Sequence, residues 1–261
     1  CSRSRCRRRR GGWKHAFATK RDGGTAAATM NLDIEGLVQR FGTTTVLDGL
    51  ELSTGDVRTL FTETEATHVQ TRVQWQILWD TNEVLWYSQR DNTAQMYLYD
   101  LKTGALKNPI TSGSWVVRGV DHVDEESRQI WFRAGGIRPG QDPYFVHFCR
   151  INFDGQGLVI LTEGEGTHSI QWSPDRKFFI DTWSRVDLPP VNQLRRADGS
   201  LVCDLEQANW TELLATGWKA AEPFVAKGRD GTTDIYGVIY RPTDFDPARK
   251  YPVIEYIYAG P

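Results

Sequence analysis

The sequence predicts a mainly β protein with about three and a half four-stranded blades of a β-propeller, followed by the first strands of an α/β domain. Two observations predict the propeller. A strand, glycine turn and strand recur with the turn glycines 44–51 residues apart, which is the length of one blade. The ten tryptophans lie mostly in alternating runs and favour large aromatic side chains packed between sheets. A change of pattern near residue 207 predicts the second domain.

Each repeat consists of an apolar strand, a tight turn and a second strand that ends in Leu or Ile. Thr-Gly or Asp-Gly supplies the positive φ that a two-residue hairpin turn needs. Further strand pairs, joined by polar turns, lie between these hairpins. The turn glycines are Gly55, Gly104, Gly155 and Gly199, and the polar turns are Asp80–Asn82, Asp124–Ser127 and Ser173–Arg176. We expect complete blades over residues 64–112, 113–163 and 164–207, and half of another over 31–62, within a propeller region of 31–207.

The segment after the propeller region changes to a helical spacing. Asn209 is a candidate N-terminal cap and Gly217 a candidate stop for a short helix. We therefore expect a helical linker over residues 208–223.

The last stretch, residues 224–261, predicts the start of a second domain. The alternating runs Phe224–Lys227 and Asp234–Arg241 flank a glycine-containing turn and predict a hairpin. The nearly continuous apolar run Val253–Tyr258 is typical of a strand buried on both faces of a parallel sheet. Such a strand is normally followed by a helix and more strands, so we expect the chain to be a truncated piece of a larger protein.

Residues 1–30 form a basic arm that does not match the repeat. Nine Lys or Arg against one Asp give it a net charge of about +8, although the whole chain carries −2. The arm lacks the apolar h-region of a secretory signal. It also lacks the aromatic or amphipathic spacing of a docking surface. We expect a disordered tail, or translated sequence foreign to the domain, and no nucleic-acid partner.

Composition indicates a globular chain, with 39% apolar and 25% charged residues. No apolar run approaches the roughly 20 residues that span a bilayer, so no membrane segment is expected. Of the four cysteines, Cys1 and Cys6 lie in the basic arm, and no Cys-x-x-Cys or Cys/His cluster occurs. We expect Cys149 and Cys203, in predicted strands, to be buried free thiols.

Candidate chemistry is sparse. The sequence contains no Gly-x-Ser-x-Gly, HExxH, P-loop, GxGxxG or EF-hand pattern, so no metal or cofactor is expected. The paired carboxylates Glu125 and Glu126 could serve as an acid/base or amine-binding pair, but their place in a polar turn favours a solvated tip. Asn152–Gly157 could be a cation loop, but its composition favours an ordinary turn. The remaining polar candidates give no metal-ligand spacing. The histidines are scattered and are expected to be structural or on the surface: His15, His68, His122, His147 and His168. Arg185, Arg195 and Arg196 are expected on an exposed strand face.

Tyr258 is the one candidate catalytic residue. It stands at the carboxyl end of the predicted buried strand, directly before Ala259-Gly260-Pro261. Active-site groups of α/β sheets lie at that strand end. A tyrosine hydroxyl there can donate a hydrogen bond to a developing oxyanion.

Several short segments, in the right order, resemble the dipeptidyl peptidase IV branch of the prolyl oligopeptidase family. The resemblance covers residues 31–261 and leaves the basic arm unmatched. The segments are Tyr97–Gly104 (YLYDLKTG), Trp115–Arg118, His122–Glu125, Gln129–Phe132, Asp142–Tyr144, Ser184–Asp187, Phe224–Gly231 (FVAKGRDG) and Tyr251–Pro261 (YPVIEYIYAGP).

The resemblance implies an eight-bladed propeller capping an α/β-hydrolase domain. The implied enzyme is a serine exopeptidase that removes N-terminal dipeptides, Xaa-Pro or Xaa-Ala, from peptides with a free N-terminus. By this resemblance Tyr258 completes the oxyanion hole. The family's serine, aspartate and histidine would follow Pro261, so the chain alone is expected to be inactive. The family's amine-binding glutamate pair belongs to earlier propeller sequence, so its role is not transferred to Glu125 and Glu126.

Two alternatives remain open at this point. One is an acylaminoacyl-peptidase or oligopeptidase of the wider family, and the other is a non-catalytic propeller scaffold that binds a protein partner. A homodimer is compatible with the resemblance, as is a periplasmic or secreted parent enzyme. The sequence itself specifies neither compartment nor oligomeric state.

Overall fold

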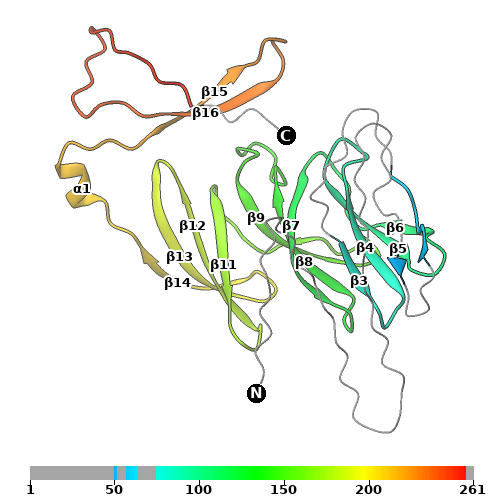
Figure 1. Cartoon of the computed structure of the whole chain (residues 1–261). Coiled ribbons are helices and arrows are strands. Elements are labelled where there is room, and N and C mark those ends of the chain that lie inside the picture. The colour runs from blue at the N-terminus through cyan, green and yellow to red at the C-terminus, as the bar shows by residue number, and fades with distance from the viewer. Residues whose placement is uncertain (1–49, 52–56, 64–74, 257–261) are drawn as a thin grey trace, which may run out of the picture. The chain divides into compact units, whose positions relative to one another are not determined.

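The computed structural model describes residues 50–51, 57–63 and 75–256, and these are mainly strands (Figure 1). Three successive sheets each contain four antiparallel strands in chain order. The first sheet consists of β3 (Trp75–Leu78), β4 (Glu83–Ser88), β5 (Gln95–Asp100) and β6 (Leu106–Pro109). The second consists of β7 (Val116–Asp124), β8 (Gln129–Gly135), β9 (Val146–Asn152) and β10 (Val159–Ile160). The third consists of β11 (Thr167–Trp172), β12 (Phe178–Arg185), β13 (Leu188–Arg196) and β14 (Leu201–Gln207).

These three sheets confirm the predicted four-stranded repeat. Of the expected half blade over 31–62, the structure describes one antiparallel pair, β1 (Leu50–Glu51) with β2 (Val57–Arg58). The remainder of that half blade lies largely outside the described residues. None of the helices in the described part of the chain has the length and apolar character needed to cross a bilayer.

The hairpin glycines that the structure describes, Gly104, Gly155 and Gly199, have the predicted positive φ, but their loops are longer than expected. In the β9–β10 hairpin the Asn152 N–H donates to the Gln156 carbonyl at 3.0 Å, which leaves three residues in the loop. Gly155 ends that loop at φ 81°. The β13–β14 hairpin repeats this arrangement with Gly199 at φ 90°. A turn followed by a left-handed glycine forms a three-residue hairpin loop, so the prediction of two-residue turns was wrong.

The same two glycines also lie close to the backbone of the sheet before them. A Cβ on Gly155 would lie 3.1 Å from the Pro109 carbonyl oxygen, at the end of β6. A Cβ on Gly199 would lie 3.0 Å from the backbone of Leu161, which directly follows β10. The repeating glycine therefore serves both the turn and the packing of each sheet against the sheet before it.

The polar turns appear where the sequence predicts them. Each is closed by a non-glycine residue in the left-handed region: Asn82 at φ 53°, Arg128 at 57° and Arg176 at 53°. Side-chain oxygens of turn residues accept backbone N–H groups, as Asp124 does from Ser127 at 3.0 Å. Such local hydrogen bonds favour turns over continued strand.

The linker helix is shorter than its pattern predicts. Helix α1 spans Thr211–Ala215, with Trp210 rather than Asn209 at the cap position. The Asn209 side-chain oxygen nevertheless accepts the Thr211 N–H at 2.8 Å, which is the hydrogen bond expected of a capping side chain. Gly217, at φ 87°, follows the helix as its predicted stop.

The hairpin after the linker is confirmed, but the buried strand that should follow it is not. β15 (Glu222–Lys227) pairs antiparallel with β16 (Asp234–Ile239), with Lys227 opposite Asp234. Residues 253–256 form no strand, and Val253, Ile254 and Tyr256 are 90%, 93% and 95% exposed. A strand buried on both faces needs a paired neighbour and two covering layers. The described residues place neither around this segment.

The main hydrophobic core lies between the first two sheets. Leu85, Met96 and Leu98 from the first sheet pack with Ile130 and Phe132 from the second, and all five are at most 3% exposed. Trp115 stacks on Phe132 with ring centroids 5.9 Å apart. We call the packed contact between the first and second sheets the apolar junction.

Candidate functional site

Tyr258, the candidate oxyanion donor, lies outside the described residues. Besides the Asn152–Gly157 turn, the sequence candidates that the structure describes lie mainly in three places: the polar turn at Glu125, a cavity between the first two sheets, and a polar contact between the second and third sheets. Within the described ranges, no three His, Cys, Asp or Glu side chains are grouped so that they could hold a metal ion.

The prediction that Glu125 and Glu126 lie at a solvated turn tip is confirmed for only one of them. Glu126 is exposed, whereas Glu125 is half-buried and its Oε2 has no hydrogen-bond partner among the described residues. Burial, followed by the negative charge of Asp80, raises the pKa of Glu125. The β7–β8 turn therefore contacts neighbouring polar groups instead of standing free in solvent, which is the physical reason that the prediction fails for Glu125.

The segment Asn152–Gly157 is an ordinary turn, the second of its two alternatives. The Asp154 carboxylate accepts the Gln156 N–H at 2.9 Å, and Gly157 lies close to the Asn152 amide. The Asn152 side-chain oxygen is used by Gln129, whose amide donates to it at 3.2 Å. These local hydrogen bonds account for the oxygens that a cation loop would need.

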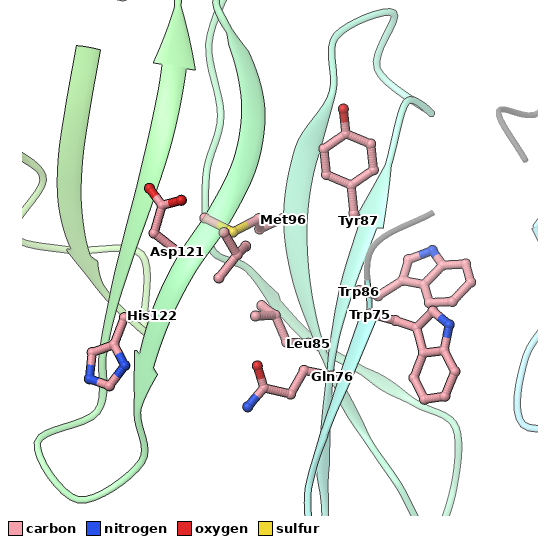
Figure 2. Close-up of a pocket in the computed structure, with 9 residues that line it drawn as sticks. Trp75, Gln76, Leu85, Trp86, Tyr87, Met96, Asp121 and His122 are labelled. Carbon is pink, nitrogen blue, oxygen red and sulfur yellow. The ribbon is translucent and has the colours of Figure 1, made fainter. Parts of the chain in front are cut away.

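A cavity of about 340 Å³ lies between the first sheet and β7 (Figure 2). Its carboxylate is already paired, because Arg133 Nε lies 2.9 Å from Asp121 Oδ1. The Tyr87 hydroxyl donates to the Val117 carbonyl at 3.1 Å. The cavity is lined by Trp75, Gln76, Leu85, Trp86, Tyr87, Met96, Val120, Asp121 and His122. Because the Asp121 carboxylate and the Tyr87 hydroxyl both have protein partners, the cavity lining specifies no ligand.

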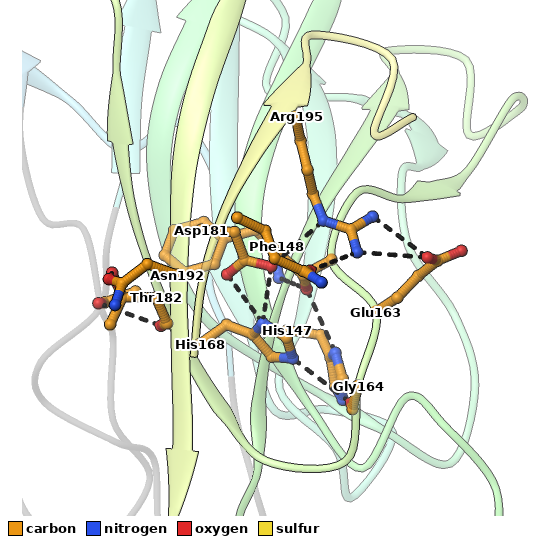
Figure 3. Close-up of polar contacts among 12 residues, drawn as sticks. His147, Phe148, Glu163, Gly164, His168, Asp181, Thr182, Asn192 and Arg195 are labelled. Atoms are coloured by element: carbon orange, nitrogen blue, oxygen red, sulfur yellow. Dashed lines mark hydrogen bonds and ion pairs between the residues drawn. The ribbon is translucent and has the colours of Figure 1, made fainter. Parts of the chain in front are cut away.

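The third place is a buried polar contact between the second and third sheets that sequence reasoning missed; we call it the polar junction (Figure 3). The β11–β12–β13 register puts His168, Asp181 and Arg195 on one face of the third sheet. Asp181 accepts from His168 Nδ1 at 2.9 Å and lies 3.5 Å from Arg195 Nε. Arg195 also donates to the Gly199 carbonyl at 2.9 Å and to Gln193 Oε1 at 2.8 Å.

The second sheet contributes His147 and its neighbours to the polar junction. The His147 and His168 rings face each other with centroids 4.8 Å apart. Glu163, which follows β10, accepts from Arg195 at 3.2 Å. The junction therefore extends from this exposed carboxylate to two buried imidazoles.

Two expectations about side-chain position are corrected here. Arg195 was expected on an exposed strand face, but its side chain is 2% exposed; Arg196, its neighbour, is exposed. The strand alternation puts Arg195 on the same face as Phe179, its partner across the ladder. Cys149 is buried as expected, and burial raises its pKa to about 12. Cys203 is exposed because β14 lies at the edge of its sheet.

The histidines were expected to be scattered, and the structure brings two of them together. His15 and His68 lie outside the described residues, and His122 lines the cavity. A sequence signal for the polar junction did exist. In the strand Phe178–Arg185, Asp181 shares a face with two aromatic residues, Phe179 and Trp183. A carboxylate on an otherwise apolar face needs a buried partner.

Comparison with known proteins identifies the repeated sheets. The sequence family described as "Dipeptidyl peptidase IV (DPP IV) N-terminal region" matches residues 36–190. Dipeptidyl peptidase 8 of Homo sapiens is 29% identical over 164 residues, which is 58% of this chain and 18% of that protein. Probable dipeptidyl-aminopeptidase B of Emericella nidulans is 28% identical over 167 residues, which is 60% of this chain and 18% of that protein.

Solved structures give the same fold. Dipeptidyl peptidase 4 of Porphyromonas gingivalis superimposes with a TM-score of 0.58 at 22% identity, over 76% of this chain and 28% of that one. A putative dipeptidyl aminopeptidase IV from Bacteroides ovatus gives the same TM-score, over 30% of that chain. The matched region spans only about a fifth of the length of the curated relatives. The chain belongs to the family of the dipeptidyl peptidase IV N-terminal region.

Proposed function

We propose that this chain forms the propeller side of a serine exopeptidase that releases N-terminal Xaa-Pro or Xaa-Ala dipeptides. The observation that carries this proposal is the family match over residues 36–190, which falls on successive four-stranded antiparallel sheets. The named relatives are dipeptidyl peptidases. The substrate is a peptide with a free N-terminus, and the working enzyme is a homodimer that needs no cofactor.

The proposed division of the chain follows the sequence pattern. Residues 31–207 supply propeller blades, residues 208–223 the linker, and residues 224–261 the first strands of the peptidase domain; residues 1–30 belong to none of these. The hairpin β15–β16 supports this division, because among the described strands it forms a sheet of its own that follows the last four-stranded sheet.

The proposed chemistry is acyl transfer through a Ser-His-Asp triad. No nucleophile elbow occurs among the 261 residues, so the triad must come from sequence outside this chain. Tyr258 contributes the hydroxyl that stabilises the oxyanion of the tetrahedral intermediate. Its position after a run of apolar residues would put it at the carboxyl end of a strand, where such groups act.

The substitution Tyr258→Phe, made in the full-length enzyme, tests this role. Removing one oxyanion donor should lower kcat by about 10²–10³-fold and leave KM nearly unchanged, because the hydroxyl acts mainly in the transition state. Tyr240→Phe is the matched control, since Tyr240 is 78% exposed and directly follows β16. Equal kcat values for the two variants would remove Tyr258 from the proposed mechanism.

The substrate class is tested on the same enzyme with free and N-acetylated Xaa-Pro substrates. The proposal requires cleavage of the free substrate and rejection of the acetylated one. Preference for the acetylated substrate would indicate an acylaminoacyl-peptidase of the wider family. Absence of turnover on both, in a folded full-length protein, would support the non-catalytic scaffold.

A further inference from the structure

The polar junction contains two buried histidines whose surroundings differ. His147, on β9, is 1% exposed, and His168, on β11, is 3% exposed. Their ring centroids are 4.8 Å apart and the ring planes make an angle of 40°. Because neither ring reaches bulk water, the neighbouring donors and acceptors decide which nitrogen carries a proton.

The partners of His147 favour a neutral ring. Its Nδ1 lies 3.2 Å from Thr162 Oγ1. The Thr162 hydroxyl accepts the Phe148 N–H at 3.1 Å and can donate its own hydrogen to Nδ1. Its Nε2 lies 2.9 Å from Gln141 Oε1, which can only accept. The opposite end of the Gln141 amide donates to the Gly164 carbonyl at 3.5 Å, which supports this orientation.

The partners of His168 favour a charged ring. Its Nδ1 lies 2.9 and 3.1 Å from the two oxygens of Asp181. Its Nε2 lies 3.4 Å from the carbonyl oxygen of Gly164. Ionised carboxylates and carbonyls have no hydrogen to donate. Both ring nitrogens of His168 are therefore satisfied only when both carry protons, and Asp181 then balances the charge.

If His168 is charged, the charged groups around the two histidines do not favour a positive charge on His147 as well. Asp181 is shared between His168 and Arg195, whose Nε lies 3.5 Å from Oδ2. Glu163 accepts from Arg195 on the outer side. Arg138, which donates to the Thr162 carbonyl at 2.8 Å, adds a positive charge on the His147 side. A proton added to His147 would thus meet two cations, His168 and Arg138, and none of the described carboxylates named here is left unpaired to balance it.

We propose that His147 and His168 form a pH-sensitive lock between the second and third sheets, in which one positive charge resides on His168 and acidification opens the contact by charging His147. The new charge would lie beside an imidazolium, and His147 Nδ1 would lose its role as acceptor for Thr162. The two histidines come from different sheets, so their repulsion acts directly on the contact between those sheets.

The direction of the pH effect follows from His147. Burial, followed by the charges of His168 and Arg138, lowers its pKa to about 4, below the value of about 6.5 for an unfolded histidine. The unfolded chain therefore binds more protons between these values. The stabilisation contributed by neutral His147 is complete above about pH 6.5 and is lost as the pH falls toward 4.

The first test compares urea unfolding of the full chain and its His147→Gln variant at about pH 7 and about pH 5. For the unsubstituted chain, the ratio of unfolded to folded protein should rise by roughly tenfold more than for His147→Gln over this interval. His122→Gln is the control, because His122 is half-buried in the cavity lining away from the polar junction. It should keep most of the acid response. An equal acid response in His147→Gln and the unsubstituted chain would overturn the lock.

The second test observes the protonation of both rings directly in the unsubstituted chain. Ring ¹⁵N NMR at neutral pH should show two protonated nitrogens on His168 and one on His147, at Nε2. His168→Gln and His147→Gln assign the resonances. A neutral His168 ring, or a doubly protonated His147 ring, would contradict the proposal even if either variant proved too unstable for unfolding measurements.

Discussion

The apolar and polar junctions join successive copies of the same four-stranded unit, yet they do so by different physics. At the apolar junction, buried Leu, Met, Ile and Phe side chains fill the space between the first two sheets. At the polar junction, His168, Asp181 and Arg195 replace such side chains on the face of the third sheet. The repeated backbone therefore determines where neighbouring sheets contact each other, and the side chains determine whether apolar packing or charged hydrogen bonds stabilise that contact.

The difference has consequences for stability and specificity. Apolar packing depends on area and shape, and it responds little to pH. A buried charge network gains stability only when every member keeps its partner, so loss of one member is costly. The polar junction should therefore be the one that responds to protons and to single charge substitutions.

The largest effect is expected from emptying the apolar junction with Phe132→Ala. Phe132 is fully buried and stacks on Trp115, so the variant leaves a cavity and should lose about 4 kcal/mol of unfolding free energy. Urea unfolding measures this loss, which should be the same at neutral and mildly acidic pH. Phe178→Ala is the matched control, because Phe178 is 37% exposed. Comparable losses for the two variants would show that this junction is not a packed core.

A loss of about 3 kcal/mol is expected from Asp181→Asn at the polar junction. The amide keeps the size of the carboxylate but cannot balance Arg195 and His168, which stay buried beside it. The exposed Asp175, in the turn before β12, provides the control. Asp175→Asn keeps an acceptor for the Lys177 N–H and should lower the urea midpoint far less than Asp181→Asn. A near-neutral Asp181→Asn would mean that the polar junction, like the apolar one, depends on packing alone.

A smaller effect is expected at the ion pairs beside the apolar junction. Glu83 on β4 bonds to Lys107 on β6 and to Arg128 at the β7–β8 turn, with Arg128 Nη2 3.0 Å from Oε1. Burial by itself would raise the pKa of Glu83, but hydrogen bonds from Arg128 and Lys107 outweigh it and lower the pKa to about 2. Since Lys107 and Arg128 are 43% and 37% exposed, solvent screens these pairs and Glu83→Gln should cost about 1 kcal/mol.

The pH dependence of Glu83→Gln distinguishes the Glu83 ion pairs from the polar junction. A carboxylate whose pKa is depressed by folding stabilises the protein above its unfolded pKa, and that contribution is lost as the pH falls from about 4.5 to about 2. The difference between Glu83→Gln and the unsubstituted chain should therefore shrink over that range. The polar junction, in contrast, should already weaken below about pH 6.5. Loss of unfolding free energy over the same pH range at the Glu83 ion pairs and at the polar junction would contradict the distinction between the two regions.

The four-stranded repeat was predictable because it depends on local signals. Glycines at regular spacing and the polar turns carry the backbone conformations that end one strand and begin the next, as Gly155 and Asn82 do. These signals act over a few neighbouring residues, so the sheets and their order could be deduced from the sequence. The hairpin β15–β16 was predictable for the same reason.

The run Val253–Tyr258 shows the limit of such signals. Its apolar residues specify a buried strand, but burial requires neighbours that local sequence does not supply. In the described part of the run the residues are exposed and form no strand. The role of Tyr258 stays a prediction, since it lies outside the described residues.

The sequence by itself determined the repeating unit, the positions of its turns and the family to which the chain belongs, because these depend on nearest neighbours and residue order. Only the tertiary structure decided that His147 meets His168 and that Arg195 is buried beside Asp181. His147 and His168 lie 21 positions apart and on different sheets. Strand alternation places each residue on a face, but only the packing of one sheet on another selects the side chain opposite it.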